Sequence, residues 1–266
     1  MVNVPDTVNY GKSLTINVTP AGGYQVDAMY YVTADGEIEF TKNNTSENGA
    51  GEYVIANVYA DGALKFVTSA REYTINNAVK TEDDKDGWVE IIDKARTGDI
   101  VTITVTSGEG YQYIPEAGST LTVTYVDNQT QETTAVELTP VEDKLDTYTF
   151  KMPNGEVTID CTFTIISYDI INDGTDALAV IVTDETPDAH NFGEEMTVKY
   201  QEEDGYVYTL KITGKTSGKE IEVTESKFTM PSEDIEVVLT REAIKYAITD
   251  LTAAHVTLSA VGGQQG

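Results

Sequence analysis

One short stretch of the sequence has acidic residues at the spacing of a calcium-binding loop. In “EDDKDGWVEIID”, residues 82–93, acidic side chains occupy positions 1, 3, 5 and 12 and a glycine occupies position 6, as in an EF-hand. Glu82 is too long for the tight turn, Asp93 reaches less far than the usual glutamate, and no amphipathic helices flank the stretch. Because Asp86-Gly87 is also a hairpin-turn signal, we predict a turn and no metal site, with weak Ca²⁺ binding as the alternative.

Other residue types that could do chemistry form no recognisable site. The two histidines, His190 and His255, have no carboxylate at metal-ligand spacing and are expected on the surface. The single cysteine, Cys161, alternates with apolar residues and is expected in the core, and one cysteine excludes disulfides within the chain. No motif for a nucleophilic serine, a phosphate or a dinucleotide is present, and carboxylates are too abundant to single out a pair. The sequence therefore predicts no catalytic residues and no cofactor, so we expect a protein that is not an enzyme.

The charge balance disfavours two classes of partner. Of 266 residues, 45 are acidic and 17 are basic, which gives a formal net charge of −28. Nucleic acids and anionic membranes attract basic surfaces, so neither is an expected partner. The hydrophobic content of 40% is enough for packed cores, and no apolar run approaches the roughly 18 residues of a membrane span. No signal-peptide pattern is present at the N-terminus, so we expect an intracellular protein or a mature or excised piece of a longer one.

Three stretches of the sequence follow the same plan. They are “GKSLTINVTPAGGY” from residue 11, “GDIVTITVTSGEGY” from residue 98 and “GEEMTVKYQEEDGY” from residue 193. In each, the first glycine and the glycine of the final Gly-Tyr are 12 residues apart. The alternation of apolar and polar residues between them is typical of a half-buried β-strand. The final tyrosines, Tyr24, Tyr111 and Tyr206, share one repeat position and are expected to be structural plugs.

Two further motifs recur along the chain. Residues 148–163 and 226–240 each read as a short strand, Met-Pro, a polar turn and a second strand, and residues 53–69 are a degraded copy without Met-Pro. A Tyr-x-Ile motif opens each new unit, at Tyr73, Tyr168 and Tyr246. An internal repeat of this kind decides the fold, because each unit is one structural module.

These motifs divide the chain into three units and a remnant: residues 1–70, 71–166, 167–243 and 244–266. Unit 1 lacks its opening strand, unit 2 carries an insertion, and the remnant holds the opening strands of a further, incomplete unit. The joints between units are short and contain no Gly or Pro, so the units are expected to abut and to form a stiff rod. Period-two patterning and frequent turn signals predict an all-β fold of tandem, small, antiparallel, Ig-like β-sandwiches. A β-grasp unit with one short helix at residues 88–95 is the alternative.

The repeated motifs resemble the internalin-type B-repeat in a divergent form. The resemblance is carried by Gly98-x-x-Val-Thr-Ile-Thr-Val, Gly110-Tyr111 and Tyr148-Thr-Phe-Lys-Met-Pro-x-x-x-Val-Thr-Ile. It covers units 2 and 3 well and unit 1 in part. B-repeats occur in tandem on surface proteins of Gram-positive bacteria, so the resemblance implies a small all-β module that is extracellular or on the cell surface. It carries no catalytic residues over to this chain.

The repeat frame is broken at both ends of the sequence. Units 2 and 3 have 25 residues from the opening Tyr to the first signature glycine, whereas unit 1 has ten before Gly11, so about 15 are missing. Residues 246–260 supply a segment of that length. Alone, this segment would expose Tyr246, Ile248, Val256 and Leu258 along an unpaired strand edge. A rod on the order of 90–100 Å long would keep it from its own N-terminus.

We therefore hypothesise strand donation, in which the C-terminal segment of one copy completes unit 1 of the next and a filament grows head-to-tail. The sequence thus predicts a non-enzymatic structural protein of the cell exterior, a surface stalk or a filament subunit, whose partners are copies of itself. One alternative is an adhesin module that binds a glycan or a host surface protein through the unit 2 insertion. The other is a fragment of a longer repeat protein, cut within a unit at both ends.

Overall fold

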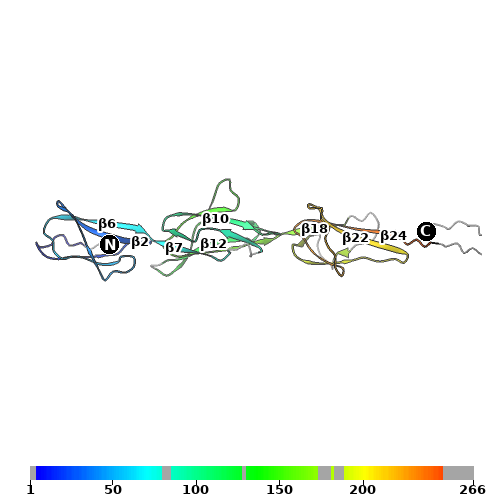
Figure 1. Cartoon of the computed structure of the whole chain (residues 1–266), viewed down its shortest axis with the longest axis horizontal. Coiled ribbons are helices and arrows are strands. Elements are labelled where there is room, and N and C mark those ends of the chain that lie inside the picture. Colours follow the sequence, from blue (N-terminus) through cyan, green and yellow to red (C-terminus); the bar gives the residue numbers. More distant parts are fainter. Residues whose placement is uncertain (1–3, 80–84, 128–129, 173–180, 183–188, 248–266) are drawn as a thin grey trace, which may run out of the picture. The chain divides into compact units, whose positions relative to one another are not determined.

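The structure is a computed structural model of the chain, and it describes residues 4–79, 85–127, 130–172, 181–182 and 189–247. Its elements are β-strands apart from one 3₁₀ turn, Pro115–Ala117, which confirms the predicted all-β fold (Figure 1). Residues 88–95, the helix of the alternative β-grasp fold, lie in and around two short strands instead. No described helix is long and apolar enough to cross a membrane. The chain divides into two compact parts, residues 1–167 and 168–266.

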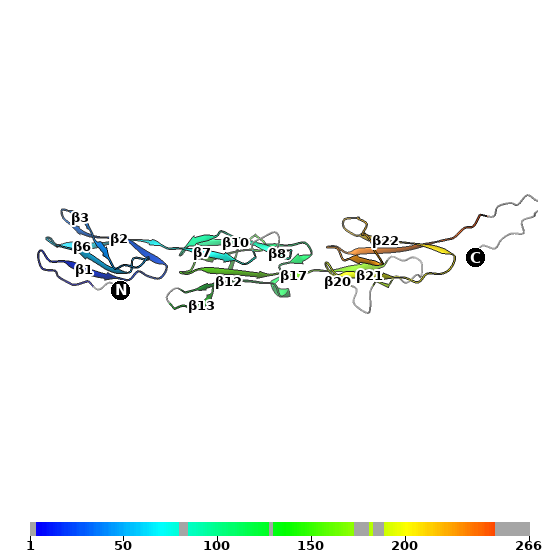
Figure 2. The same ribbon diagram turned by 60° about the horizontal axis from the view of Figure 1, so that its bottom comes forward.

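Unit 1 is a sandwich of two three-stranded antiparallel sheets, ordered β1-β5-β4 and β3-β2-β6. Its strands are β1 (Leu14–Val18), β2 (Tyr24–Thr33), β3 (Gly36–Glu39), β4 (Thr41–Asn43), β5 (Gly51–Ile55) and β6 (Gly62–Ala70). Figure 2 shows β1 on the opposite side of the unit from β2, β3 and β6. Alternate side chains of the two sheets, such as Ile16 on β1 and Met29 on β2, meet in one buried core.

Unit 2 has larger sheets around its own core. One sheet has the order β14-β15-β10-β8, the second has the order β13-β12-β16-β7-β9, and β11 pairs with β17. The strands are β7 (Glu72–Asn77), β8 (Gly87–Glu90), β9 (Lys94–Arg96), β10 (Ile100–Ser107), β11 (Tyr111–Gln112), β12 (Thr120–Val126), β13 (Thr133–Ala135), β14 (Thr139–Pro140), β15 (Thr147–Lys151), β16 (Val157–Thr162) and β17 (Thr164–Ile165). Two strands from the stretch between Tyr111 and Tyr148 join the main sheets: β13 pairs with β12 as β3 pairs with β2 in unit 1, and β14 pairs with β15 as β4 pairs with β5.

Unit 3 again has two sheets, ordered β20-β18-β24-β22 and β19-β21-β23. Its strands are β18 (Ser167–Asn172), β19 (Ile181–Val182), β20 (Ala189–Asn191), β21 (Glu195–Lys199), β22 (Tyr206–Gly214), β23 (Lys227–Thr229) and β24 (Ile235–Ala243). Met196 and Val198 from one sheet pack with Ile212 and Val237 from the other. The unit therefore has a core of its own.

The signature stretches form the same strand in each unit, namely β1, β10 and β21. The glycines that bound each stretch have positive φ angles: Gly11 (72°) and Gly23 (78°), Gly98 (92°) and Gly110 (74°), Gly193 (78°) and Gly205 (90°). Residues with a Cβ rarely adopt this conformation, so a glycine is needed at both turns. The repeated glycine spacing therefore reflects two turns that each need a glycine and the strand that lies between them.

Candidate functional site

In units 2 and 3 the opening strand lies inside a sheet, between two other strands of its unit. In unit 2, β7 separates β16 from β9, and in unit 3, β18 separates β24 from β20. The pairing of β7 with the closing strand β16 is parallel, with Ile75 opposite Val157, and unit 3 repeats this register. The pairing of β7 with β9 is antiparallel, with Tyr73 opposite Ala95. The opening strand therefore joins two strands through both of its edges.

Unit 1 has both neighbours of this position, but the described residues place no strand between them. The closing strand β6 is the counterpart of β16 and β24, and in the described part of the chain it pairs with β2 alone. Gly11 and Gly98 are 87 residues apart, so residues 7–9 are the counterpart of β9. Val8 packs against the core of unit 1, as its counterpart Ala95 packs in the core of unit 2. In the part of the chain that the structure describes, unit 1 is therefore a sandwich with one sheet open at this strand position.

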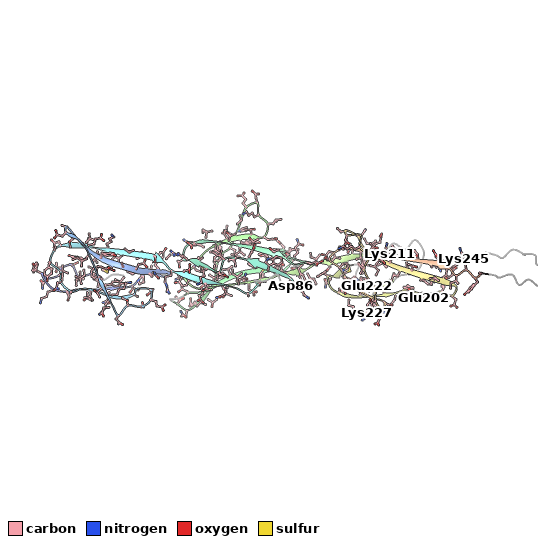
Figure 3. All side chains as sticks on the ribbon, viewed as in Figure 1. Asp86, Glu202, Lys211, Glu222, Lys227 and Lys245 are labelled. Carbon is pink, nitrogen blue, oxygen red and sulfur yellow. The ribbon has the colours of Figure 1, made fainter. Side chains whose placement is uncertain are left out.

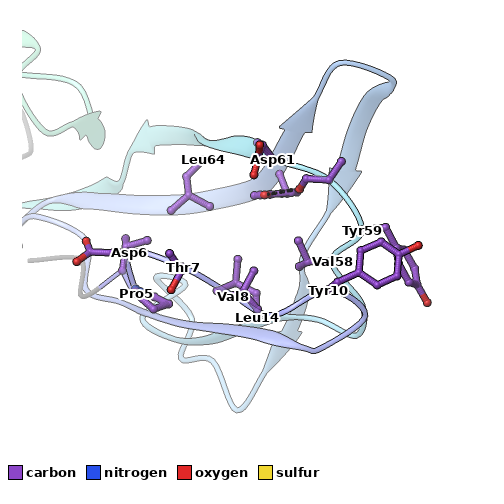
Figure 4. Close-up of a pocket in the computed structure, with 14 residues that line it drawn as sticks. Pro5, Asp6, Thr7, Val8, Tyr10, Leu14, Val58, Tyr59, Asp61 and Leu64 are labelled. Carbon is purple, nitrogen blue, oxygen red and sulfur yellow. Dashed lines mark hydrogen bonds between the residues drawn. The ribbon is translucent and has the colours of Figure 1, made fainter.

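A cavity of about 470 Å³ lies between these two segments (Figure 4). Thr7 and Val8 line one wall, and Gly62 and Leu64 of β6 line the other. Figure 4 shows Leu64 on the opposite side of the cavity from Thr7 and Val8. We call this cavity the unit 1 cleft.

The inward side chains of β6 are less covered than their counterparts in the other units. Counted back from the Tyr-x-Ile motif, Leu64 corresponds to Ile159 of β16 and to Val237 of β24, which are both buried. Leu64 and the next inward residue, Phe66, are only half-buried. Full burial of an aliphatic or aromatic side chain stabilises a fold by roughly 1.5–3 kcal/mol. A strand that covered β6 would therefore gain apolar contacts that unit 1 lacks.

The ring of Tyr31 fills the end of the cleft beside Gly62. Gly62 holds the position of Val157 and Ile235, whose side chains are buried in their own units. The ring of Tyr31 fills this space in unit 1, since a Cβ on Gly62 would lie 2.7 Å from its Cζ. The Tyr31 hydroxyl donates a hydrogen bond of 2.8 Å to the carbonyl of Ala60, which satisfies its polar end. The cleft therefore offers apolar side chains, together with the carboxylates of Asp6 and Asp61, beside an edge of β6 that no described strand pairs with.

The chain leaves all three units in the same way. Two residues before each Tyr-x-Ile motif, a backbone N–H donates to the carbonyl of the second signature glycine over 2.8 Å: Arg71 to Gly23, Ile166 to Gly110 and Ile244 to Gly205. Lys245 follows at this end of unit 3 (Figure 3). Tyr246 is 82% exposed. The C-terminal end of unit 3 therefore has the same hydrogen bond as the ends of units 1 and 2, which are each followed by an opening strand.

The predicted self-association residues are only partly within the described chain. Tyr246 is described and exposed, whereas Ile248, Val256 and Leu258 lie outside the described residues. The sequence analysis did not identify the residues of unit 1 that would accept the donated strand, namely those that line the unit 1 cleft. Their signal was present in the 87-residue offset, which aligns residues 7–9 with β9.

The calcium-like stretch lies partly outside the described residues, since Glu82 and Asp84 are not described. Asp86 is in a turn that leads into β8, and Asp93 lies between β8 and β9, so the described part of the stretch joins strands. Burial and a hydrogen bond to Asp86 raise the pKa of Tyr111. Among the described residues, no three His, Cys, Asp or Glu side chains gather as a metal site would require.

The prediction for His190 is wrong, and that for Cys161 is confirmed. His190 is 7% exposed, and its Nδ1 lies 3.6 Å from Oε2 of Glu194. It occupies the repeat position of Ala95, which faces the core, and this explains its burial. Cys161 is buried, and burial raises the pKa of its thiol to about 12. His255 lies outside the described residues.

The three signature tyrosines are not the plugs that the repeat predicted. Tyr24 is 42% exposed, and Tyr111 and Tyr206 are half-buried. Arg241 lies over the ring of Tyr206, with its guanidinium carbon 4.6 Å from the ring centroid. These rings therefore lie at the surface of the turns rather than in the cores.

Comparison with known proteins assigns no family to the chain. No protein-family model and no curated protein matches it. Among solved structures it is similar to the crystal structure of the chicken CNTN1 FN1–FN3 domains, with 7% sequence identity over 90% of this chain and 91% of that chain. The TM-score of this similarity is 0.17. The class of protein therefore follows from the strands alone: a chain of tandem, small β-sandwich units.

Proposed function

We propose that the chain is a non-enzymatic structural protein of the cell exterior whose copies join head-to-tail by strand donation. In this proposal the segment that begins at Tyr246 enters the unit 1 cleft of another copy. The open strand position between β6 and residues 7–9 carries the proposal. The resemblance to tandem B-repeats of bacterial surface proteins supports the extracellular location, as either a surface stalk or a filament.

The donated segment has the pattern of the strands that fill the same position in units 2 and 3. Tyr246 and Ile248 match Tyr73 and Ile75, which are both buried beside β9 and β16. In the same register, Tyr246 lies opposite Val8 and Ile248 lies opposite Gly62. Added strands of this kind bind through backbone hydrogen bonds, and alternate side chains provide specificity. The donor would run parallel to β6 and satisfy its unpaired edge.

The hydrogen bond at the exit from unit 3 supports this proposal. Ile244 is held to Gly205 as Arg71 is held to Gly23, and β7 begins one residue after Arg71. A joint between two copies would therefore repeat the joint between units 1 and 2. The donor and the cleft are different surfaces, so the contact is heterologous, and successive copies build a filament when the rotation between them does not close a ring.

Light scattering on the full chain and on a chain without residues 246–266 tests the proposal. We expect the full chain to form concentration-dependent polymers and the shortened chain to stay monomeric. Electron microscopy of the full chain is expected to show filaments. A full chain that remains monomeric at high concentration contradicts strand donation.

A second candidate function is adhesion through the unit 2 insertion. Leu145, in the loop between β14 and β15, is 93% exposed, so this loop presents an apolar side chain that a partner would cover. A glycan array and a host-protein binding assay, each with Leu145→Ala as the comparison, test this function. Equal signals for the two chains would exclude this loop as the binding surface.

A further inference from the structure

A close contact between units 1 and 2 shows how one unit ends against the next. The side chain of Thr97 packs so closely against Gly23 that a Cβ at Gly23 would lie 2.5 Å from Oγ1 and 2.6 Å from Cγ2 of Thr97. The Thr97 N–H donates to the carbonyl of Arg71 over 3.0 Å, and the Arg71 N–H donates to Gly23. Gly23 is thus needed both for its positive φ and for this close approach.

The two halves of an equivalent contact lie at the donor and acceptor ends of the chain. Gly205 is the counterpart of Gly23, and a Cβ built on it meets no atom of the described chain within 4 Å. Tyr10 is the counterpart of Thr97, since it directly precedes the first signature glycine. Tyr10 is 81% exposed, and its ring packs edge-on against Tyr59 with centroids 5.2 Å apart. Both surfaces are therefore accessible where a second copy would dock.

We infer that Tyr10 of one copy packs against Gly205 of the copy that donates its strand. This contact rests on the proposed strand donation and adds a second, end-on interface to it. The larger ring of Tyr10 covers the turn at Gly205 and Tyr206 as Thr97 covers Gly23 in unit 1. Tyr59 holds the Tyr10 ring on its other side, which reduces the entropy lost when the ring docks. The occupant of this aromatic surface is thus another copy of the chain.

The two interfaces are separated by measuring peptide binding and assembly on the same variants. The acceptor for the peptide assay is the full chain with Ile248→Asp, whose own donor segment is disabled. A fluorescent peptide of residues 244–260 is the probe, and its binding is followed by anisotropy. Assembly of chains with an intact donor segment is followed by light scattering.

Tyr10 also lines the unit 1 cleft, so Tyr10→Ala is expected to raise the dissociation constant of the peptide, but by no more than about twofold, because the peptide lacks the turn at Gly205 that the Tyr10 ring covers. It is expected to raise the concentration needed for assembly about tenfold, as truncation of a buried interface aromatic does. Gly205→Asn, which tolerates a positive φ better than other substitutions, is expected to impair assembly from the other side of the contact. Ile92→Ala removes an exposed apolar side chain in unit 2 and is expected to change neither measurement.

Two results would overturn the end-on contact. The first is unchanged assembly by Tyr10→Ala. The second is an equal loss of peptide binding and assembly, which would show that Tyr10 only shapes the cleft. If the unmodified cleft neither binds the peptide nor supports assembly, the proposed strand donation itself fails, and the end-on contact fails with it.

Discussion

Units 1 and 2 share their signature strand, their closing strand and their exit hydrogen bond, but they differ at one sheet position. In unit 2 that position holds β7, whose Ile75 is 1% exposed. In unit 1 the same position is the unit 1 cleft, and Leu64 beside it is half-buried. The comparison shows that the described residues of unit 1 form a packed core without a described strand at this position. It also shows that, among the described residues, β6 has a backbone edge at this position, for which unit 2 supplies a register.

The largest effect is expected when the donor segment loses its inward side chain. Ile248→Asp would place a charge opposite Gly62 in a cleft that the carboxylates of Asp6 and Asp61 already line, and burial of an unpaired carboxylate costs several kcal/mol. We expect assembly to be abolished in light scattering. Thr249→Asp is the matched control, because Thr249 corresponds to the exposed Asn76 on the outward side of β7. Equal losses from the two variants would contradict the proposed register.

A graft that fills the cleft should make unit 1 resemble unit 2. Replacement of residues 1–10 by a copy of residues 71–97 supplies the counterparts of β7 and β9 ahead of Gly11. We expect this chimera to stay monomeric in light scattering, and we expect its unit 1 to be more stable by roughly 1.5–3 kcal/mol per inward side chain that becomes buried. Chemical denaturation measures the gain. A graft with aspartate at the copied position of Ile75 is the control, and the comparison fails if both grafts behave alike.

Truncations of single side chains test the comparison within each core. Ile75→Ala removes a fully covered side chain and is expected to cost about 2–5 kcal/mol of unfolding free energy. Leu64→Ala acts beside the cleft and is expected to cost less, about 1 kcal/mol, because its side chain is already partly solvated. Denaturant titration of the shortened, monomeric chain measures both values. If Leu64→Ala costs as much as Ile75→Ala, the edge of unit 1 is as well covered as the core of unit 2.

The strands of these units could be predicted because period two decides which side chains face the core. Ile16 and Ile103, which the repeat placed in register, are both fully buried. The position of the opening strand inside a sheet could not be predicted, because β7 pairs with β16 across a separation of about 80 residues that local pattern does not encode. The error at His190 has the same cause. The sequence analysis expected His190 on the surface because it recognised no ligand or partner for it. Its position in the repeat, opposite the opening strand, instead places the side chain toward the core.

The smallest effect is expected at the calcium-like stretch, where we predict no tight binding. Asp86, a ligand that an EF-hand at residues 82–93 would need, is already hydrogen-bonded with Tyr111. The described part of the stretch joins β8 and β9, so no helix pair supports the loop. We expect calorimetry to give a dissociation constant for Ca²⁺ weaker than about 10⁻⁵ M, the weak end of the sensor range. Asp84→Ala is expected to leave the titration unchanged, and tighter binding that this substitution abolishes would establish a calcium site in unit 2 that unit 1 lacks.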